Sequence, residues 1–292
     1  GVDVRGVPTR ETFQDFTDFD DVPIEDFLLE HTTRSVLENF FRPLLSAKFG
    51  DRWREVSAAW LLARVRFRGE RDLTRGEILG YLDGGFGRLL DALVGSVGRE
   101  NIATGARVTG LGFTNGRVES LTVETGGESA ETHDVDAVVV ATMPNVLEAL
   151  TGYTCEIEFQ GTVCSVISMA ESLTDTYWLN IAEDVPFGAL VEHTNFVPPD
   201  RYGGEHLLYA VSYVQDMDED LWQMDDEGVE EAWLSGIESL FPDFDRGAVN
   251  WIQTARNPRT APVYERGYLD MVVPYDLSEA VAEGVYYAGM AS

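Results

Sequence analysis

Residues 135–142 constrain the fold more than any other part of the sequence. They read Val-Asp-Ala-Val-Val-Val-Ala-Thr, and a β-branched run with apolar residues on both faces is typical of a strand buried in a parallel sheet. A helix is predicted to begin near Pro144, which indicates an α/β arrangement. Since ligands of open α/β sheets bind beyond the carboxyl ends of strands, residues 141–144 form either a ligand-binding edge or a plain strand-to-helix connection.

Helical and antiparallel patterns flank this strand. Apolar residues recur at helical spacing through residues 22–98 and again at 226–241, where Pro242 ends the pattern. Two alternating runs, 107–113 and 117–124, are joined by Asn115-Gly116, which predicts a hairpin. Residues 153–215 predict several longer strands. The fold class is therefore a combination of α/β and α+β.

The charge balance restricts the partners. The 292 residues include 51 Asp and Glu against 21 Lys and Arg, a formal net charge of −30, and Lys48 is the sole lysine. Such a charge is self-repelling in dilute buffer, and a Debye length of about 3 Å at 1 M salt removes most of the repulsion. We interpret the composition as adaptation to a salt-rich cytoplasm, with an acidic surface and no nucleic-acid partner.

Targeting and metal signals are absent from the sequence. No apolar run reaches the roughly 18 residues of a membrane span, and no signal peptide is visible, which favours a cytoplasmic protein. Cys155 and Cys164 are predicted to be buried thiols. Asp216, Asp218, Asp220 and Glu227 match part of a calcium loop, but leucine stands where the loop requires glycine. No metal site is predicted.

Two short motifs are candidates for function. Gly84-Gly85-Phe86 opens a predicted helix, where glycine lets a ligand approach open backbone N–H groups; an ordinary loop would look the same. His193 and Asn195 could support proton transfer or serve as structural hydrogen-bonding groups. No glycine-rich dinucleotide fingerprint follows any predicted strand.

The ordered set of motifs in residues 81–147 resembles the flavin-containing amine oxidase superfamily, which includes protoporphyrinogen oxidases and carotenoid desaturases. The set comprises Gly84-Gly85-Phe86 before a helix with Leu90-Asp91-Ala92-Leu93, a strand containing Val108, and a strand ending Ala141-Thr142-Met143-Pro144. The resemblance implies FAD as cofactor. The cofactor-binding residues that it implies are Gly84, Gly85, Phe86, Val108, Ala141, Thr142, Pro144, Gly289 and Met290.

The resemblance also implies two interleaved domains. A partial FAD/NAD(P)-binding, Rossmann-like domain would comprise 77–150 and 248–292, and a helix-plus-antiparallel-sheet substrate domain would comprise 22–76 and 151–247. The family's N-terminal glycine fingerprint and C-terminal helix have no counterpart here. We therefore expect a piece of a longer chain, truncated at both ends, which alone would hold FAD weakly or not at all and be inactive.

The expected activity of the full-length protein is oxidation of a small organic molecule by hydride transfer to flavin. The aromatic and polar residues expected to line the substrate cavity are Tyr177, Trp178, His193, Asn195, Tyr209 and Tyr213; His193, Asn195 and Tyr213 are the catalytic candidates. Two alternatives stay open: a non-redox flavin enzyme resembling UDP-galactopyranose mutase, and a non-catalytic binding domain. The substrate, the electron acceptor and the oligomeric state are not predicted.

Overall fold

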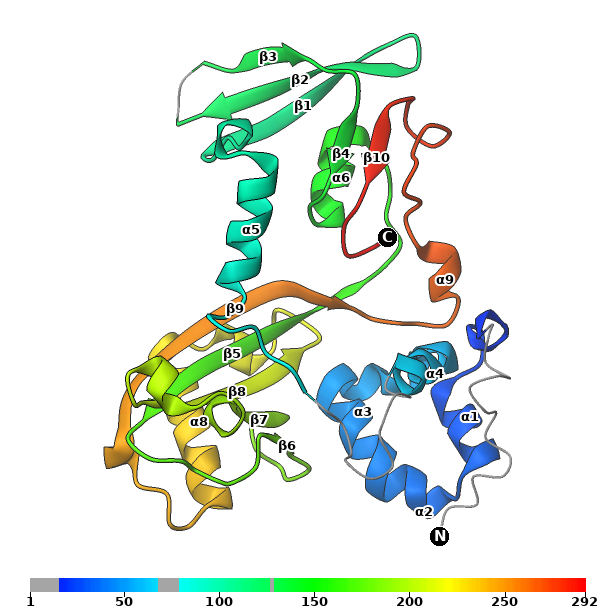
Figure 1. Ribbon diagram of the computed structural model, residues 1–292. Helices are drawn as coiled ribbons and strands as arrows, with labels where there is room; N and C mark the ends of the chain where they lie inside the picture. Colours follow the sequence, from blue (N-terminus) through cyan, green and yellow to red (C-terminus); the bar gives the residue numbers. More distant parts are fainter. Residues whose placement is uncertain (1–15, 68–78, 127–128) are drawn as a thin grey trace. The chain divides into compact units, whose positions relative to one another are not determined.

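A computed structural model describes residues 16–67, 79–126 and 129–292 (Figure 1). The chain divides into two compact units. Unit 1 comprises residues 1–69 and 158–270, and unit 2 comprises residues 70–157 and 271–292. In the described ranges, no helix is long and apolar enough to cross a membrane.

Unit 1 is built on a five-stranded antiparallel sheet in the order β6-β7-β8-β5-β9 (Figure 1). The strands are β5 (Phe159–Met169), β6 (Trp178–Asn180), β7 (Ala189–Glu192), β8 (His206–Val214) and β9 (Val249–Pro262). Ser165 of β5 lies opposite Ala210 of β8 on one side and Thr254 of β9 on the other. Because β5 is paired on both edges, its alternating apolar residues form the centre of the core.

Helix α8 (Asp226–Leu240) packs against this sheet. Its N-terminus is capped by the Asp225 carboxylate, which accepts a hydrogen bond from Gly228 N at 2.8 Å. Trp233 is fully buried and donates its indole N–H to Ser165 Oγ at 2.6 Å, so the largest core side chain has a partner for its polar atom. The helix predicted over residues 226–241 is confirmed. The short elements nearby are η6 (His193–Asn195), η7 (Pro199–Tyr202), α7 (Asp220–Gln223) and η8 (Arg246–Ala248).

The N-terminal helices of unit 1 form a second core. They are η2 (Thr17–Phe19), α1 (Ile24–His31), α2 (Arg34–Val36), η3 (Leu37–Phe41), α3 (Arg42–Phe49), η4 (Gly50–Glu55) and α4 (Ala58–Phe67). Element η3 is a π-type turn between α2 and α3. It precedes Pro43, whose ring would clash with the Asn39 carbonyl in a regular α-helix. The buried side chains of this core include Val263, which follows β9, so the helices and the sheet share apolar contacts.

The described part of unit 2 contains a small antiparallel sheet, a parallel strand pair and three helical segments. The antiparallel sheet has the order β1 (Ala106–Thr114), β2 (Arg117–Thr125) and β3 (Glu131–Asp134). Asn115 and Gly116 join β1 and β2 with φ of 51° and 77°, as expected for a type I′ turn, and the predicted hairpin is confirmed. Strand β4 (Val138–Val140) pairs in parallel with β10 (Val285–Tyr287). The helices are α5 (Gly87–Val97), η5 (Arg99–Asn101) and α6 (Pro144–Thr151); α9 (Tyr268–Met271) spans the position in the sequence where unit 1 ends and unit 2 resumes.

The mixed α/β and α+β class is confirmed, and two details differ from expectation. The unit boundary does not fall at 248, because β9 pairs with β5 over residues 249–262 and so belongs to the same sheet as residues 158–247. The strand predicted over 135–142 spans only 138–140, and Val139 is 53% exposed, so burial on both of its faces is wrong. The described part of unit 2 has two parallel strands, with β10 as the parallel partner of β4.

Candidate functional site

The carboxyl ends of β4 and β10 bring together five of the predicted cofactor-binding residues. Parallel pairing of Val140 with Tyr287 places residues 141–144 and 288–290 at the same edge. Ala288 N donates to Val140 O at 3.0 Å, and Tyr287 Oη donates to Thr142 O at 3.1 Å. The residues at this edge are Ala141, Thr142, Pro144, Gly289 and Met290.

Backbone is open at this edge because small residues follow both strands. Ala141, Thr142 and Ala288 are exposed, and Met290 is 45% exposed. A Cβ on Gly289 would collide with Tyr287 Oη and would lie 2.5 Å from Thr142 O, so only glycine fits there. A parallel strand edge with accessible backbone suits a dinucleotide, which binds beyond strand carboxyl ends.

The glycine step forms a separate structure at the start of α5. Gly85 N donates to Leu82 O at 2.8 Å, and both Gly84 and Gly85 have positive φ, of 85° and 77°. A positive φ at the third turn position is typical of a type II turn and requires glycine. Phe86 then precedes the helix. The hydrogen bonds described for residues 84–86 are local, so their assignment to the same cofactor as the β4–β10 edge stays a prediction.

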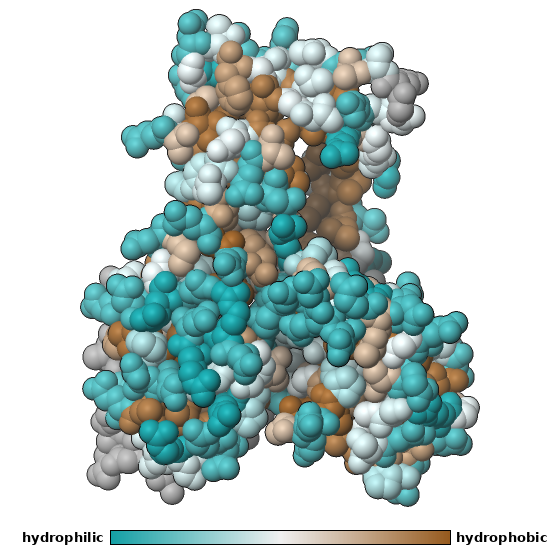
Figure 2. Space-filling view, turned by 180° about the vertical axis from the view of Figure 1, so that it is seen from behind, coloured by the Kyte–Doolittle hydropathy of each residue, from teal (hydrophilic) through white to brown (hydrophobic). Residues whose placement is uncertain are grey.

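Helix α5 presents an uncovered apolar stripe. Phe86, Leu89, Leu90, Leu93 and Val97 follow helical spacing, and all are about half exposed or more, up to 62% for Leu90. Val108 on β1 is also exposed. Figure 2 shows hydrophobic side chains at the surface of the part drawn uppermost, which is unit 2. Contiguous apolar surface of this kind marks a binding or packing face.

The proposed substrate-cavity residues of unit 1 are engaged with one another and with the loops. His193 Nε2 lies 2.6 Å from Tyr202 Oη, the His193 ring stands edge-on to Tyr209, and burial lowers the pKa of His193. Asn195 donates to Thr174 O at 2.7 Å and so fastens a loop. Since these side chains already have protein partners, their assignment to a cavity stays a prediction.

The remaining candidates occupy different environments. Tyr177 contacts the ring of Phe196 at 5.1 Å, and Trp178 is exposed and donates its indole N–H to Asn180 Oδ1 at 3.0 Å. Tyr213 is different, because its hydroxyl accepts a hydrogen bond from Lys48 Nζ at 3.2 Å. Sequence reasoning missed Lys48 as a site residue. Its uniqueness as a lysine among many arginines was the signal that could have identified it.

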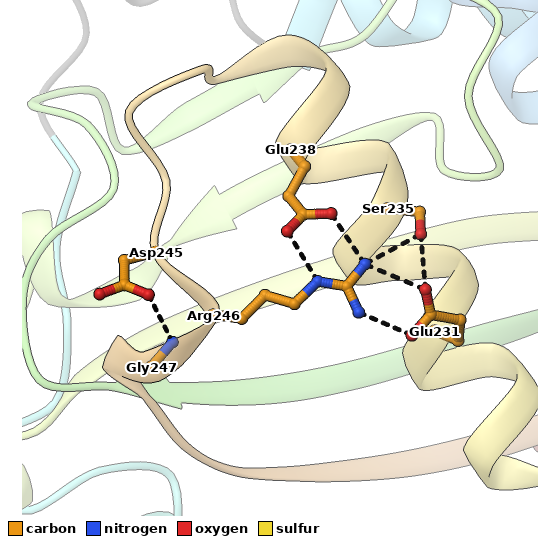
Figure 3. Close-up of polar contacts among 6 residues, drawn as sticks. All are labelled: Glu231, Ser235, Glu238, Asp245, Arg246 and Gly247. Atoms are coloured by element: carbon orange, nitrogen blue, oxygen red, sulfur yellow. Dashed lines mark hydrogen bonds and ion pairs between the residues drawn. The ribbon is translucent and has the colours of Figure 1, made fainter.

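The strongest charge cluster of unit 1 is structural. Arg246 Nε donates to Glu238 at 2.7 Å, and its terminal nitrogens donate to Glu231 at 2.6 and 3.0 Å (Figure 3). These contacts and one from Ser235 lower the pKa of Glu231 to about 2. We call Arg246 with Glu231, Ser235 and Glu238 the Arg246 clamp. Beside it, Gly247 N donates to Asp245 Oδ1. Every partner is a protein group on α8 or the loop after it, so the cluster fixes the loop to the helix.

Neither a metal-binding group nor the cavity described below involves the predicted site residues in the described part of the chain. Within the described residues, no group of three His, Cys, Asp or Glu side chains could hold a metal ion. A cavity of about 380 Å³ lies in unit 1 between the ends of β5 and α8. Its lining includes Glu171, Leu173, Phe241 and Asp243, and none of the predicted catalytic or cofactor-binding residues.

Comparison with known sequences defines the protein family to which the chain belongs. A flavin-containing amine oxidoreductase sequence profile matches residues 9–292, and the chain belongs to that family. Membership indicates a flavin cofactor, and the resemblance inferred from the motifs is confirmed. No curated protein sequence matches the chain.

Solved structures with similar folds share little sequence. An oxidoreductase from Methanosarcina mazei has a TM-score of 0.67 at 17% identity, over 92% of this chain and 63% of that one. Reduced UDP-galactopyranose mutase has a TM-score of 0.62 at 14% identity, over 85% and 57%. Cyclohexylamine oxidase from Brevibacterium oxydans IH-35A has a TM-score of 0.57 at 13% identity, over 95% and 64%. The chain thus spans less than two thirds of the length of each of these proteins.

Proposed function

We propose that the complete protein is an FAD-dependent oxidoreductase that oxidises a small organic molecule. The observation that supports this is the edge formed by β4 and β10, where Ala141, Thr142 and Ala288 are exposed, in a chain of the flavin-containing family. When bound, the flavin would supply the redox chemistry by accepting a hydride from the substrate.

The roles of the chain's own residues are binding and orientation. We assign cofactor binding to unit 2 and substrate binding to unit 1. Ala141, Thr142 and Gly289 would hold the dinucleotide through backbone contacts, because Ala141 and Thr142 are exposed and Gly289 carries no side chain. Val108 and the apolar stripe of α5 would be covered in the complete protein, since their exposed area is large for a folded surface.

The test is titration of FAD into the complete protein, with flavin absorbance retained after gel filtration as the readout. Ala141→Glu places a negative charge at the edge, and Ala130→Glu adds the same charge at another exposed alanine of unit 2. Repulsion of about 1.4 kcal/mol or more between the new carboxylate and the cofactor phosphates would weaken binding at least about tenfold in Ala141→Glu. Equal FAD affinity in the two variants would contradict the placement, and a colourless wild type at saturating FAD would contradict the function.

A second candidate function is non-redox flavin chemistry, because the fold is also similar to that of reduced UDP-galactopyranose mutase. A turnover assay distinguishes the two candidate functions. Conversion of a sugar nucleotide without net consumption of an electron acceptor would support the second candidate, whereas substrate oxidation coupled to acceptor reduction would support the first.

A further inference from the structure

Two cations of unit 1 lie against the same pair of aromatic rings, and neither has a carboxylate partner among the described residues. Lys48, in the last turn of α3, has its Nζ 3.2 Å from Tyr213 Oη and 4.3 Å from the centre of the Tyr213 ring. Arg64 of α4 lies close enough that its charge acts on Lys48 and on Tyr213. Among the described residues, neither Lys48 nor Arg64 forms an ion pair. This is notable in a chain with 51 acidic and 21 basic residues, because carboxylates are abundant.

Aromatic side chains surround these cations. Arg64 lies over the Trp60 ring at 5.6 Å, and Lys48 Nζ lies 5.4 Å from the centre of the Phe49 ring. The Phe49 and Trp60 rings meet edge to face at 5.0 Å. Tyr264 continues the aromatic surface beyond Trp60, at a ring separation of 6.1 Å. Aromatic faces stabilise the cations.

Unused hydrogen-bonding groups adjoin the cluster. Trp60 Nε1 is a buried donor without a partner in the described structure. Gln160 is fully buried on β5, and in the described structure its Nε2 and the Oε1 of Gln215 both lack a partner. Gln215 Nε2 donates to Gln160 Oε1 at 2.9 Å and to Lys48 O at 3.4 Å, which connects this amide pair to α3. Buried donors without partners are rare in folded proteins, so Trp60 Nε1 indicates a missing acceptor beside the cations.

We propose that Lys48 and Arg64, with the hydroxyl of Tyr213, bind the oxyanion of an organic ligand that has an apolar body. A carboxylate or a phosphate ester satisfies the two cations, and the aromatic side chains contact the rest of the molecule. The proposal goes beyond the oxidoreductase function, because every residue of the site belongs to unit 1 and binding requires no flavin.

Proton linkage provides a direct readout. Burial, with a smaller contribution from Arg64, lowers the pKa of Lys48 to about 8. The groups that face the ammonium from other elements are Arg64 and Tyr213, and the causes of the shift include no carboxylate. An anion held beside the ammonium stabilises its charged form and therefore raises its pKa. Binding near pH 8 is then accompanied by proton uptake.

Lys48 is the sole lysine of the 292 residues, which simplifies this measurement. We expect protein grown with ¹³C-labelled lysine to give a side-chain ¹³Cε signal of Lys48, identified by its loss in Lys48→Met, whose pH titration is followed by NMR. The probes are benzoate and phenyl phosphate, with neutral benzamide as control. The expected result is an upward shift of the titration midpoint by about one pH unit at saturation with an anionic probe, and none with benzamide. A response to only one anion identifies that oxyanion as the ligand group.

Three variants test the residues. Lys48→Met and Arg64→Gln are expected to weaken anion binding about tenfold or more, since charge-assisted hydrogen bonds of this strength are lost. Arg42→Gln removes a cation from the same helix, but one already paired with Glu38 at 2.6 Å, and should bind like wild type. If Lys48→Met fails to fold, the proposal is still tested by anion binding to Arg64→Gln, because Arg64 is exposed, and by the titration of Lys48 in the wild type. An unmoved midpoint with both anions, or unchanged affinity in Arg64→Gln, overturns the proposal.

Discussion

The hydroxyl of Tyr287 donates a hydrogen bond to the carbonyl oxygen of Thr142, 3.1 Å away, and so joins the ends of two parallel strands that are 145 residues apart in sequence. Tyr287 is fully buried. The bond holds the chain after β4 against the chain after β10 and fixes the edge to which we assign the cofactor.

Tyr287→Phe should therefore destabilise the protein. Removal of the hydroxyl leaves Thr142 O without this donor, and the expected loss is about 1 kcal/mol in the free energy of unfolding. Chemical denaturation followed by circular dichroism measures it. Tyr275→Phe is the matched control, because Tyr275 is 59% exposed and makes no side-chain hydrogen bond in the described structure. Equal stability of the two variants would argue against a structural role for the bond.

Gly289→Ala tests the crowding at the same edge. The added Cβ would collide with Tyr287 Oη and press on Thr142 O, so the chain after β10 must move. Overpacking of this kind costs about 1–3 kcal/mol. Gly110→Ala on β1 is the control, since nothing lies within 4 Å of the Cβ position. A midpoint of thermal unfolding that falls in Gly289→Ala and stays unchanged in Gly110→Ala is the expected outcome.

Glu192→Gln tests a buried carboxylate in unit 1. Glu192 is 2% exposed and accepts hydrogen bonds from Leu173 N and Thr174 N, both at 2.8 Å, and from Ser172 Oγ at 2.6 Å. An amide nitrogen at either oxygen position would face a donor. We expect a loss of about 1–3 kcal/mol by equilibrium denaturation. Exposed Glu171→Gln is the control, and a similar loss there would mean that charge alone is responsible.

The Arg246 clamp gives a prediction for pH. Hydrogen bonds from Arg246 and Ser235 lower the pKa of Glu231 to about 2 from an ordinary 4.5. A depressed carboxyl pKa stabilises the fold above the unfolded value, and this contribution is lost as the pH falls from about 4.5 to about 2. In Arg246→Gln, NMR titration should show the Glu231 pKa returning toward 4.5. Arg42→Gln on α3 should leave it low. Salt screens the exposed pair of Arg246 and Glu231, so added salt should bring the pKa of Glu231 in the wild type closer to 4.5.

Salt should stabilise the folded chain. With a net charge of −30, repulsion among surface carboxylates opposes the compact state, and a Debye length that falls from about 10 Å at 0.1 M to 3 Å at 1 M removes most of it. The temperature of half-unfolding should therefore rise when KCl is increased from about 0.1 to about 1 M. A melting temperature that falls or is constant over this range would contradict the interpretation of the composition as salt adaptation.

Local chemistry explains which parts of the fold the sequence predicted. Asn115-Gly116 adopts the positive φ values that a two-residue hairpin needs, and Asp225 caps α8 as its position before the apolar pattern indicates. These features depend on neighbouring residues only, so they can be inferred from short segments.

Non-local pairing accounts for what the sequence did not predict. The boundary at 248 failed because β9 completes a sheet with β5, whose paired residues lie 80 to 103 positions earlier in the chain. Lys48 was overlooked because its partner Tyr213 is 165 residues away. Parallel pairing of β4 with β10 places residues 141–144 and 289–290 at one edge, which no local pattern could predict. Their common role in cofactor binding, together with the glycine step at 84–85, stays a prediction.

The π-type turn η3 determines how a deletion would affect the direction in which the Lys48 side chain points. Residues 34–49 are helical throughout, and the π-type segment Leu37–Phe41 inserts extra arc between α2 and α3. Each residue of an α-helix advances the azimuth by about 100°. A π-type turn holds one residue more than an α-helical turn, so deleting one residue within η3 would restore regular α-helix and leave the direction of Lys48 about unchanged. Deleting one residue of α3 before Lys48 would instead turn the ammonium about 100° around the helix axis.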